Sequence, residues 1–299
     1  MASKYVVAAQ LASHTLDTTE RVGFKRIVVA TDFSTAAEKG VHYAVEIAKR
    51  YRAALYVSHV QGAPVYTYAP AAAWPELAEE DKAFREEGRA KLEEVLKDIP
   101  HELIFQEGEI SETLKDIVRE KQADLVVLGT HGRSGLDKAL MGSVAEKIFR
   151  ELRVPVLTLG PKVVAKALSS AELSRILYAT DFTAESLHAA PYAISLSREH
   201  RANLILLNCF EGGEDGIQAM LEGLRQLVPF GAELRCEPIC IVERGPHGKK
   251  ILDVAESHGT DLIVLGVDGI SKGMGMGFRG SSLYKIVTQA SCPVLTVRA

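Results

Sequence analysis

Short apolar runs alternate along the chain with longer segments in which apolar and charged residues recur at helical spacing. The runs at residues 27–30 and 125–128 contain no polar alternation, which is typical of central parallel strands buried on both faces. Between residues 37 and 48 an apolar stripe repeats every three or four positions, as expected of a helix that covers a sheet. This succession of strand and helix patterns predicts βαβ units and an α/β fold.

Three sequence landmarks occur twice, in the same order. RIVVATDF at residues 26–33 returns as RILYATDF at residues 175–182, with six of eight positions identical. The other landmarks are DLVVLG at 124–129 with DLIVLG at 261–266, and PVLTLG at 155–160 with PVLTVR at 293–298. Because unrelated strands would not also repeat this order and spacing, the chain is predicted to be a tandem duplication.

Each copy is expected to contain five strands in one parallel sheet flanked by helices. In the first copy the expected strands are residues 26–31, 54–60, 102–106, 124–128 and 155–159. The segment from residue 160 to 174 has no strand pattern and is interpreted as a linker. The expected organisation is an N-terminal extension at 1–22, a first domain at 23–160, a linker at 161–173 and a second domain at 174–299.

The connection after the second strand differs between the copies. Residues 61–75 are rich in Ala, Pro and Tyr and precede a long charged helix, whereas the second copy passes from Glu211 into a shorter helical segment. The first copy is therefore predicted to carry an insertion here. Such a loop serves either as a lid or partner surface, or is a surface insertion that the fold tolerates.

Composition narrows the class of protein. The 299 residues are 47% apolar and 25% charged, which is ordinary globular usage. A net charge of -4 argues against nucleic acid or an anionic membrane as the main partner. The four cysteines form no C-x-x-C pair and are expected to be buried thiols in a reducing compartment, and no apolar stretch approaches a membrane span. We therefore expect a cytoplasmic protein.

A glycine-rich loop follows the buried strand that ends at Leu128. Gly129 and Gly132 are followed, after nine residues, by Gly142 and Ser143 at the start of an amphipathic segment. Glycines let the backbone approach an anion, and the unpaired amides and positive dipole end of a helix N-terminus attract phosphate. Ser143 either contacts phosphate directly or only caps the helix. The first copy is thus predicted to contain a phosphate-binding loop.

This loop and its neighbouring strands resemble the universal stress protein family, whose ATP-binding members carry G-x2-G-x9-G-(S/T) at this place. The likeness includes the Ala-Thr-Asp end of the first strand and the closing Pro-Val-Leu strand, and it spans nearly the whole chain twice. It implies two tandem Rossmann-like domains of the adenine nucleotide alpha hydrolase type, with ATP, accompanied by Mg²⁺, as the ligand. The residues that it implies at the adenine and ribose end are Asp32 and Val60, and those at the ribose and phosphates are Gly129, Gly132, Gly142, Ser143 and Val144.

Two further considerations bear on this crevice. Open α/β sheets bind ligands at the carboxyl ends of strands, at a topological switch point, and Asp32, Val60 and Gly129 are all expected at such ends. Arg133 is the cation nearest to the phosphates in sequence, and it either contacts them or is a solvated loop residue.

The second copy departs from the loop pattern. Its loop residues are Gly266, Gly269, Gly280 and Ser281. The loop is one residue longer, and Asp268 places a negative charge where phosphates would lie. Asp268 therefore either weakens ATP binding or implies a cation there, although Lys272 and Arg279 could offset its charge. The adenine-end positions would be taken by Asp181 and Cys209. We expect one competent site and one altered site.

Other cofactor and catalytic signatures are weak or missing. Residues 275–280 spell G-x-G-x-x-G, but no Asp or Glu occurs from residue 269 onward, so the acidic residue of a dinucleotide site is absent. The chain has no G-x4-G-K-(S/T) motif. His131 has no second His or Cys at ligand spacing and is interpreted as an exposed loop residue rather than a metal ligand.

Three functions are compatible with these features. The first is an ATP-binding regulatory or stress-response protein, because the phosphate loop comes without a catalytic base. The second is a slow ATP hydrolase or self-phosphorylating protein, and the third is a structural scaffold that binds no nucleotide. By resemblance, single-copy family members dimerise through their last strands. Residues 155–159 and 293–297 are thus expected to pair within the chain as a pseudo-dimer, and further self-association into a homo-oligomer is expected.

Overall fold

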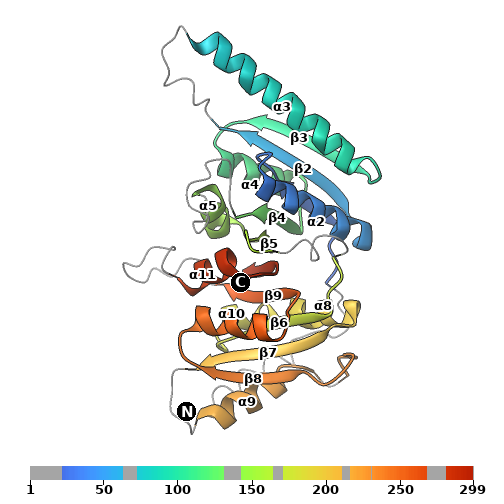
Figure 1. The fold of residues 1–299 in the computed structure, drawn as a ribbon. Helices are drawn as coiled ribbons and strands as arrows, with labels where there is room; N and C mark the ends of the chain where they lie inside the picture. The colour runs from blue at the N-terminus through green and yellow to red at the C-terminus, as the bar shows by residue number, and fades with distance from the viewer. Residues whose placement is uncertain are drawn as a thin grey trace.

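The computed structural model (Figure 1) describes residues 22–62, 73–130, 143–163, 171–210, 216–229, 231–267 and 281–298. The first copy contains β1 (Arg26–Ala30), α2 (Thr35–Tyr51), β2 (Ala54–Gln61), α3 (Trp74–Leu96), β3 (His101–Glu107), α4 (Ile110–Glu120), β4 (Leu125–Gly129), α5 (Ser143–Glu151) and β5 (Val156–Leu159). All five strands predicted for this copy are present, and each end lies within one residue of its predicted position.

The second copy repeats the alternation of strands and helices. Its elements are β6 (Arg175–Ala179), α7 (Ala184–Leu187), α8 (Ala190–His200), β7 (Asn203–Phe210), α9 (Ile217–Gln226), β8 (Ile239–Arg244), α10 (His247–Ser257), β9 (Leu262–Val267), α11 (Ser282–Gln289) and β10 (Val294–Arg298). One helix of the first copy, α2, corresponds here to two shorter helices, α7 and α8. The predicted α/β duplication is confirmed.

The ten strands form one continuous sheet in the order β3-β2-β1-β4-β5-β10-β9-β6-β7-β8. Within each copy the strands are parallel, and the two halves join through an antiparallel pair, β5 and β10, in which Leu157 lies opposite Leu295. The Thr158 hydroxyl donates to the carbonyl of Val294 (3.2 Å), and the Thr296 hydroxyl donates to that of Val156 (3.1 Å). The expected pairing of the last strands within the chain is therefore present.

The aspartate immediately before β4 and before β9 has a structural role that explains why the Asp-Leu landmark occurs twice. The Asp124 carboxylate accepts hydrogen bonds from the backbone N–H groups of Lys25 and Arg26, at 2.9 to 3.1 Å. In the second copy, Oδ2 of Asp261 accepts from the N–H groups of Ser174 and Arg175, at 2.9 Å each. Because these donors lie at the start of the first strand of each copy or immediately before it, the aspartate joins that strand to its neighbour in the sheet.

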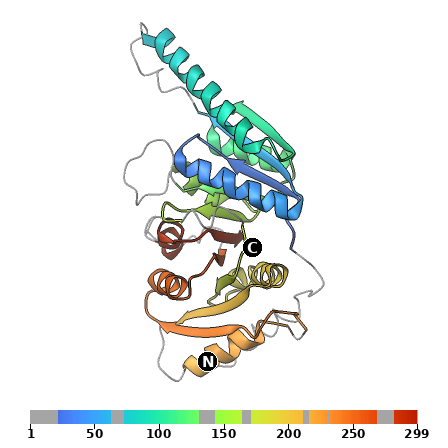
Figure 2. The same cartoon turned by 45° about the vertical axis from the view of Figure 1, so that its right-hand side comes forward.

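The helix that follows the predicted insertion lies at the outer edge of the sheet. Residues 63–72 fall outside the described part of the chain, and α3, which follows them, is 23 residues long against 10 for α9. Only Gly88, Leu92 and Leu96 of α3 are buried, and Figures 1 and 2 show its N-terminal part extending beyond the sheet. Within the described ranges, no helix combines the length and the apolar character that crossing a membrane requires.

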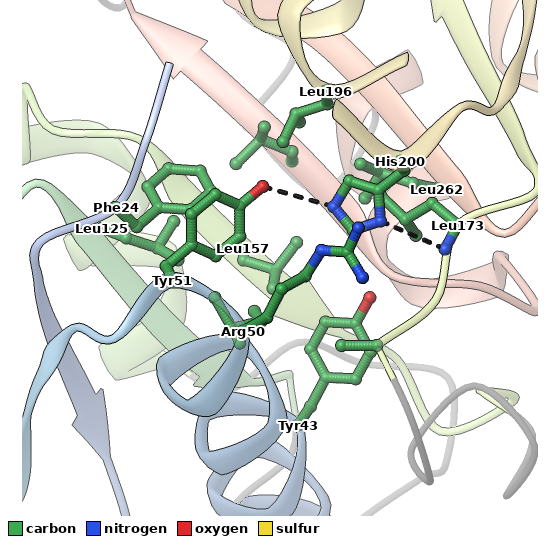
Figure 3. Close-up of a pocket in the computed structure, with 13 residues that line it drawn as sticks. Phe24, Tyr43, Arg50, Tyr51, Leu125, Leu157, Leu173, Leu196, His200 and Leu262 are labelled. Carbon is green, nitrogen blue, oxygen red and sulfur yellow. Dashed lines mark hydrogen bonds between the residues drawn. The ribbon is translucent and has the colours of Figure 1, made fainter. Parts of the chain in front are cut away.

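The two copies also meet at a small apolar cavity of about 30 Å³, shown in Figure 3. His200 at the end of α8 lies beside it, with Nε2 3.2 Å from the hydroxyl oxygen of Tyr51 at the end of α2. The backbone N–H of Leu173 donates to Nδ1 of the same ring (3.4 Å). Nearby, the N–H of Val22 donates to the hydroxyl of Ser195 (2.8 Å). The Tyr51–His200 hydrogen bond connects the copies beyond the β5–β10 pair, and the Val22–Ser195 bond joins the residue before the first copy to the second copy.

Candidate functional site

Three of the residues predicted in the first copy come together at one edge of the sheet. β1 pairs with β2 on one side and β4 on the other, with Val29 level with both Val57 and Val127. The chain runs outward from β1 in both directions, so this is the topological switch point of the copy. Asp32 follows the end of β1, Val60 lies next to the end of β2, and Gly129 ends β4. Asp32, Val60 and Gly129 therefore lie at the ends of neighbouring strands, as expected from the sequence.

The repeated ATDF segment builds a turn that leads from strand to helix. The Thr31 hydroxyl oxygen accepts from the N–H of Phe33 (3.1 Å), and Oδ1 of Asp32 accepts from the N–H of Ser34 (3.0 Å). Phe33 has a φ of 62°, a left-handed conformation that is uncommon for a bulky residue. Ser34 then caps α2 by accepting from the N–H of Ala37 (3.2 Å). Asp32 thus stabilises the turn that leads from β1 into α2.

The second copy repeats this turn closely. Thr180 accepts from the N–H of Phe182, whose φ is 63°, and Thr183 caps α7 through the N–H of Ser186. Oδ1 of Asp181 accepts from both the N–H (3.0 Å) and the hydroxyl (2.6 Å) of Thr183. Partial burial acts to raise the pKa of Asp181, but the hydrogen bonds from Thr183 outweigh it and hold that pKa below its usual value. Asp181 is therefore a carboxylate at neutral pH.

Sequence reasoning missed the packing partner of each left-handed phenylalanine. A Cβ added to Gly88 in α3 would lie 2.6 Å from the ring of Phe33, and one added to Gly223 in α9 would lie 3.0 Å from the ring of Phe182. A glycine at each position lets the helix approach the turn closely. The repeated phenylalanine was the available signal, but its partner lies on a helix whose length differs between the copies.

Gly129 and Gly266 are required by packing at the ends of their strands. A Cβ on Gly129 would meet the carbonyl carbon and oxygen of Ala36 in α2 at 3.0 Å. A Cβ on Gly266 would clash with the carbonyl oxygen of Glu185 and with Cα of Ser186 in α7. Both glycines therefore let the first helix of their copy pass directly over the strand end, whether or not a ligand is bound.

The remaining loop residues can be placed only in part. Gly132, Arg133 and Gly142 of the first copy, and Gly269 and Gly280 of the second, lie outside the described residues, as do His131 and Asp268. Ser143 and Val144 form the first turn of α5, but their side chains are outside the described part. Ser281 caps α11 by accepting from the N–H of Tyr284 (3.1 Å). The capping role considered for Ser143 is thus present at its counterpart.

A cavity of about 330 Å³ opens at the switch point of the second copy. It brings together Asp181, Cys209 and Gly266, three of the residues that the resemblance implied for this copy. The lining residues that sequence reasoning did not identify include Glu185, Ser186, His247, Ser282 and Leu283. They come from α7, α10 and α11, and their place in the cavity depends on tertiary packing that no local motif specifies.

The cysteines differ more in exposure than predicted. Cys292 is buried, Cys209 and Cys240 are half-buried, and Cys236 is exposed and precedes β8, so the expectation of four buried thiols is wrong for Cys236. All four are free thiols. Burial, and secondarily the nearby Glu243 carboxylate, raises the pKa of Cys209 to about 11. Cys209 is therefore a neutral part of the cavity wall rather than a nucleophile.

This difference predicts the order of thiol modification. At neutral pH, iodoacetamide is expected to label exposed Cys236 at least about tenfold faster than Cys209, because Cys209 is shielded and almost entirely protonated. Peptide mass spectrometry after timed quenching measures both rates in one sample. Labelling in denaturant is the control, and it should bring the two rates together. Faster labelling of Cys209 in the folded protein would contradict the assignment.

The model of the universal stress protein family matches the chain twice, over residues 23–159 and 172–298. The chain belongs to this family. A universal stress protein of Methanocaldococcus jannaschii is 33% identical over 141 residues, which are 45% of this chain and 81% of that protein. Universal stress protein YxiE of Bacillus subtilis is 31% identical over 147 residues, again 45% of this chain but 97% of the relative. These relatives correspond to one copy.

The two-copy architecture is also found among solved structures. A universal stress protein from Archaeoglobus fulgidus has a TM-score of 0.67, with 91% of this chain and 98% of that chain covered at 22% identity. A putative universal stress protein from Pseudomonas aeruginosa has a TM-score of 0.59, with 92% and 93% covered at 18% identity. At these identities the likeness shows the fold of the tandem universal stress protein, an α/β fold with a mostly parallel sheet.

Proposed function

We propose that this universal stress protein is a nucleotide-dependent regulatory protein of the stress response, which binds ATP in the crevice of its first copy. The observation that carries the proposal is the meeting of Asp32, Val60 and Gly129 at the switch point of the sheet. This edge is where open α/β sheets bind ligands, and in this chain the strand end continues into the complete G-x2-G-x9-G-S sequence.

The helix after the glycine loop supports a phosphate role. α5 begins at Ser143 and runs for nine residues, so it has the unpaired N-terminal amides that attract anions. Ion pairs attach α5 to α4: Lys147 lies 3.2 Å from Glu109 and 3.4 Å from Glu112, and Lys115 lies 2.7 Å from Glu151. Exposed ion pairs each contribute little to the free energy of unfolding. We therefore infer that this network positions α5 rather than stabilising the fold.

The residues present fit a nucleotide and require no further metal ligands from the protein. Among the described residues, no group of three or more His, Cys, Asp or Glu side chains gathers as a metal site. A Mg²⁺ ion that accompanies ATP would be held chiefly by the phosphates, as this hard cation commonly is. The turn bond from Ser34 gives Asp32 a structural role, and binding without turnover is sufficient to account for the crevice.

Isothermal titration of the full chain with ATP tests the proposal. Saturable binding is expected, and Asp32→Asn should weaken it by at least about tenfold, because the amide keeps an acceptor for Ser34 but loses the charge that strengthens bonds to ligand hydroxyls. A Gly142→Val/Ser143→Ala double variant should abolish it. Asp116→Asn, the same chemical change on exposed α4, is the matched control and should bind normally.

Two results would contradict ATP binding at this crevice. One is the absence of ATP binding to the wild-type chain, and the other is equal binding by the loop double variant. Measuring released phosphate in the same samples tests the slow hydrolase alternative. A solved universal stress protein in complex with cAMP covers 46% of this chain with a TM-score of 0.32. Titration with cAMP under the same conditions is an additional probe of the crevice.

A further inference from the structure

The cavity of the second copy has a more polar wall than the matching positions of the first copy. The two copies can be aligned around this crevice, because the ATDF turns, the strand ends and the helix starts coincide. One replacement, Thr130 to Val267, removes a hydroxyl group. The other five considered, first copy to second, are Ala36 to Glu185, Ala37 to Ser186, Val60 to Cys209, Ile110 to His247 and Val144 to Ser282. Each exchanges an apolar side chain for one that carries a polar or ionisable group. The second crevice is therefore built for a different ligand.

Glu185 is the replacement with the largest electrostatic consequence. Its backbone carbonyl lies directly over Gly266, near the end of β9, and this half-buried residue lines the cavity. In the first copy the backbone carbonyl of Ala36 lies over Gly129, and Ala36 brings no charged side chain. Glu185 thus adds a negative charge at the end of the crevice where, in the first copy, the phosphate loop starts.

The described charges near this carboxylate are either negative or already paired. Asp181, an ionised carboxylate, lines the same cavity, and no Lys or Arg is among the described residues that line it. Lys250, on the adjoining α10, is 2.8 Å from Glu243 and is thereby paired. A triphosphate brought into this cavity would face two carboxylates across a partly desolvated space, where like charges repel more strongly than in water.

The same wall suits an uncharged ligand with hydroxyl groups and a flat ring. Asp181 offers carboxylate oxygens to ligand hydroxyls, and Thr183 and Ser282 add hydroxyl groups at the rim. The apolar side chains that line the cavity are Ile251, Leu265, Leu283 and Ile286. A volume of about 330 Å³ is within the range of small-molecule sites. Hydroxyl acceptors beside an apolar wall match the ribose and base of a nucleoside.

We infer that the second crevice binds an uncharged nucleoside and excludes nucleoside triphosphates, with Glu185 as the residue that discriminates by charge. The choice of an adenine nucleoside as probe rests on the proposed function of the first crevice. The expected exclusion of triphosphates rests only on the residues that line the second crevice. The chain would then sense two ligand classes, one in each half of a continuous sheet.

Titration of the full chain with adenosine and with ATP tests this inference. Adenosine is expected to fill the second crevice, and ATP is expected to bind there at least about tenfold more weakly. Asp181→Ala should remove this adenosine-selective site. Glu185→Gln keeps the shape of the side chain without its charge and should improve ATP binding at the second crevice by about tenfold. Glu256→Gln, on the exposed side of α10, is the control and should not change ATP binding there.

The outcomes separate this inference from the proposed function. Equal affinity of adenosine and ATP at the Asp181-dependent site would overturn the inference, and so would unchanged ATP binding in Glu185→Gln or no adenosine binding at all. These results leave ATP binding by the first crevice intact. Conversely, if the wild-type chain binds no ATP but keeps an Asp181-dependent adenosine site that accepts ATP in Glu185→Gln, the proposed function fails and the inference stands.

Discussion

Replacing Gly266 by alanine is expected to lower the free energy of unfolding by about 3 kcal/mol, at the upper end of overpacking effects. The added Cβ would overlap the carbonyl oxygen of Glu185 and Cα of Ser186, which are backbone atoms of α7 and cannot move aside as a flexible side chain can. Either β9 or α7 must shift, and β9 is held on both sides by β6 and β10. Urea denaturation followed by circular dichroism measures the loss.

Gly129→Ala provides the matched control for this prediction. The corresponding Cβ would lie 3.0 Å from the carbonyl carbon and oxygen of Ala36, a tight contact that a small backbone adjustment relieves. We expect a cost of about 1 kcal/mol there. If both variants lose the same stability, the closer approach of α7 to β9 is not energetically important. Because both measurements are made without nucleotide, they report packing independently of any role of these glycines in binding.

The glycines show what the sequence could and could not specify about the site. Their position after a buried strand predicted a loop at a strand end, and the structure has both strand ends where expected. The contact of Gly266 with Glu185 joins segments about eighty residues apart, so no local pattern could reveal it. Sequence reasoning therefore assigned both glycines to a ligand alone, whereas the packing of the first helix already requires them.

The fold was predictable because its signals are local and occur twice. Apolar runs without alternation identified β1 and β4 as central strands, and the order of strands places both inside the sheet. The repeated landmarks each have a local structural cause: the turn at Asp32, and the strand-head carboxylate of Asp124 that joins β1 to β4. The side chains that line the second cavity from α7 and α10 depend instead on how helices pack, which the periodicity of each helix does not fix.

The contact between the copies around His200 likewise could not be predicted from the sequence. Tyr51 and His200 are the last residues of two helices in different copies, 149 positions apart, and neither belongs to a repeated landmark. Only the antiparallel joining of β5 and β10 brings these helix ends together. This contact has a consequence for the response of the protein to acid, because a buried imidazole titrates differently from an exposed one.

Lowering the pH from 6.5 to 4 is expected to destabilise the wild-type chain by about 2 kcal/mol more than a His200→Asn variant. Burial, and secondarily the positive charge of Arg50, lowers the pKa of His200 from 6.5 to about 4. In this interval the unfolded chain binds a proton that the folded chain does not, so the stability present above pH 6.5 is lost as pH falls toward 4. The full shift corresponds to about 3 kcal/mol, reduced here because the ring is partly exposed.

The hydrogen bonds of His200 explain why protonation of its ring is unfavourable in the folded protein. Nδ1 of His200 accepts the N–H of Leu173, so protonating that nitrogen would remove an acceptor and place two donors against each other. The other charged groups nearby are Arg50 on α2 and Glu199, whose carboxylate hydrogen-bonds the Tyr51 hydroxyl. Asn at position 200 retains an acceptor for Leu173 without a group that titrates in this range.

Urea midpoints at intervals between pH 4 and 7.5 would measure the effect as the difference in slope between the two proteins. His188→Asn, at an exposed histidine that follows α7, is the control for loss of an imidazole and should keep the wild-type slope. Carboxylates also titrate below pH 5, but they are common to all three proteins and cancel in the difference. Parallel curves for the wild type and His200→Asn would mean that His200 accepts its proton in the folded state, and that the contact between the copies tolerates a charged ring.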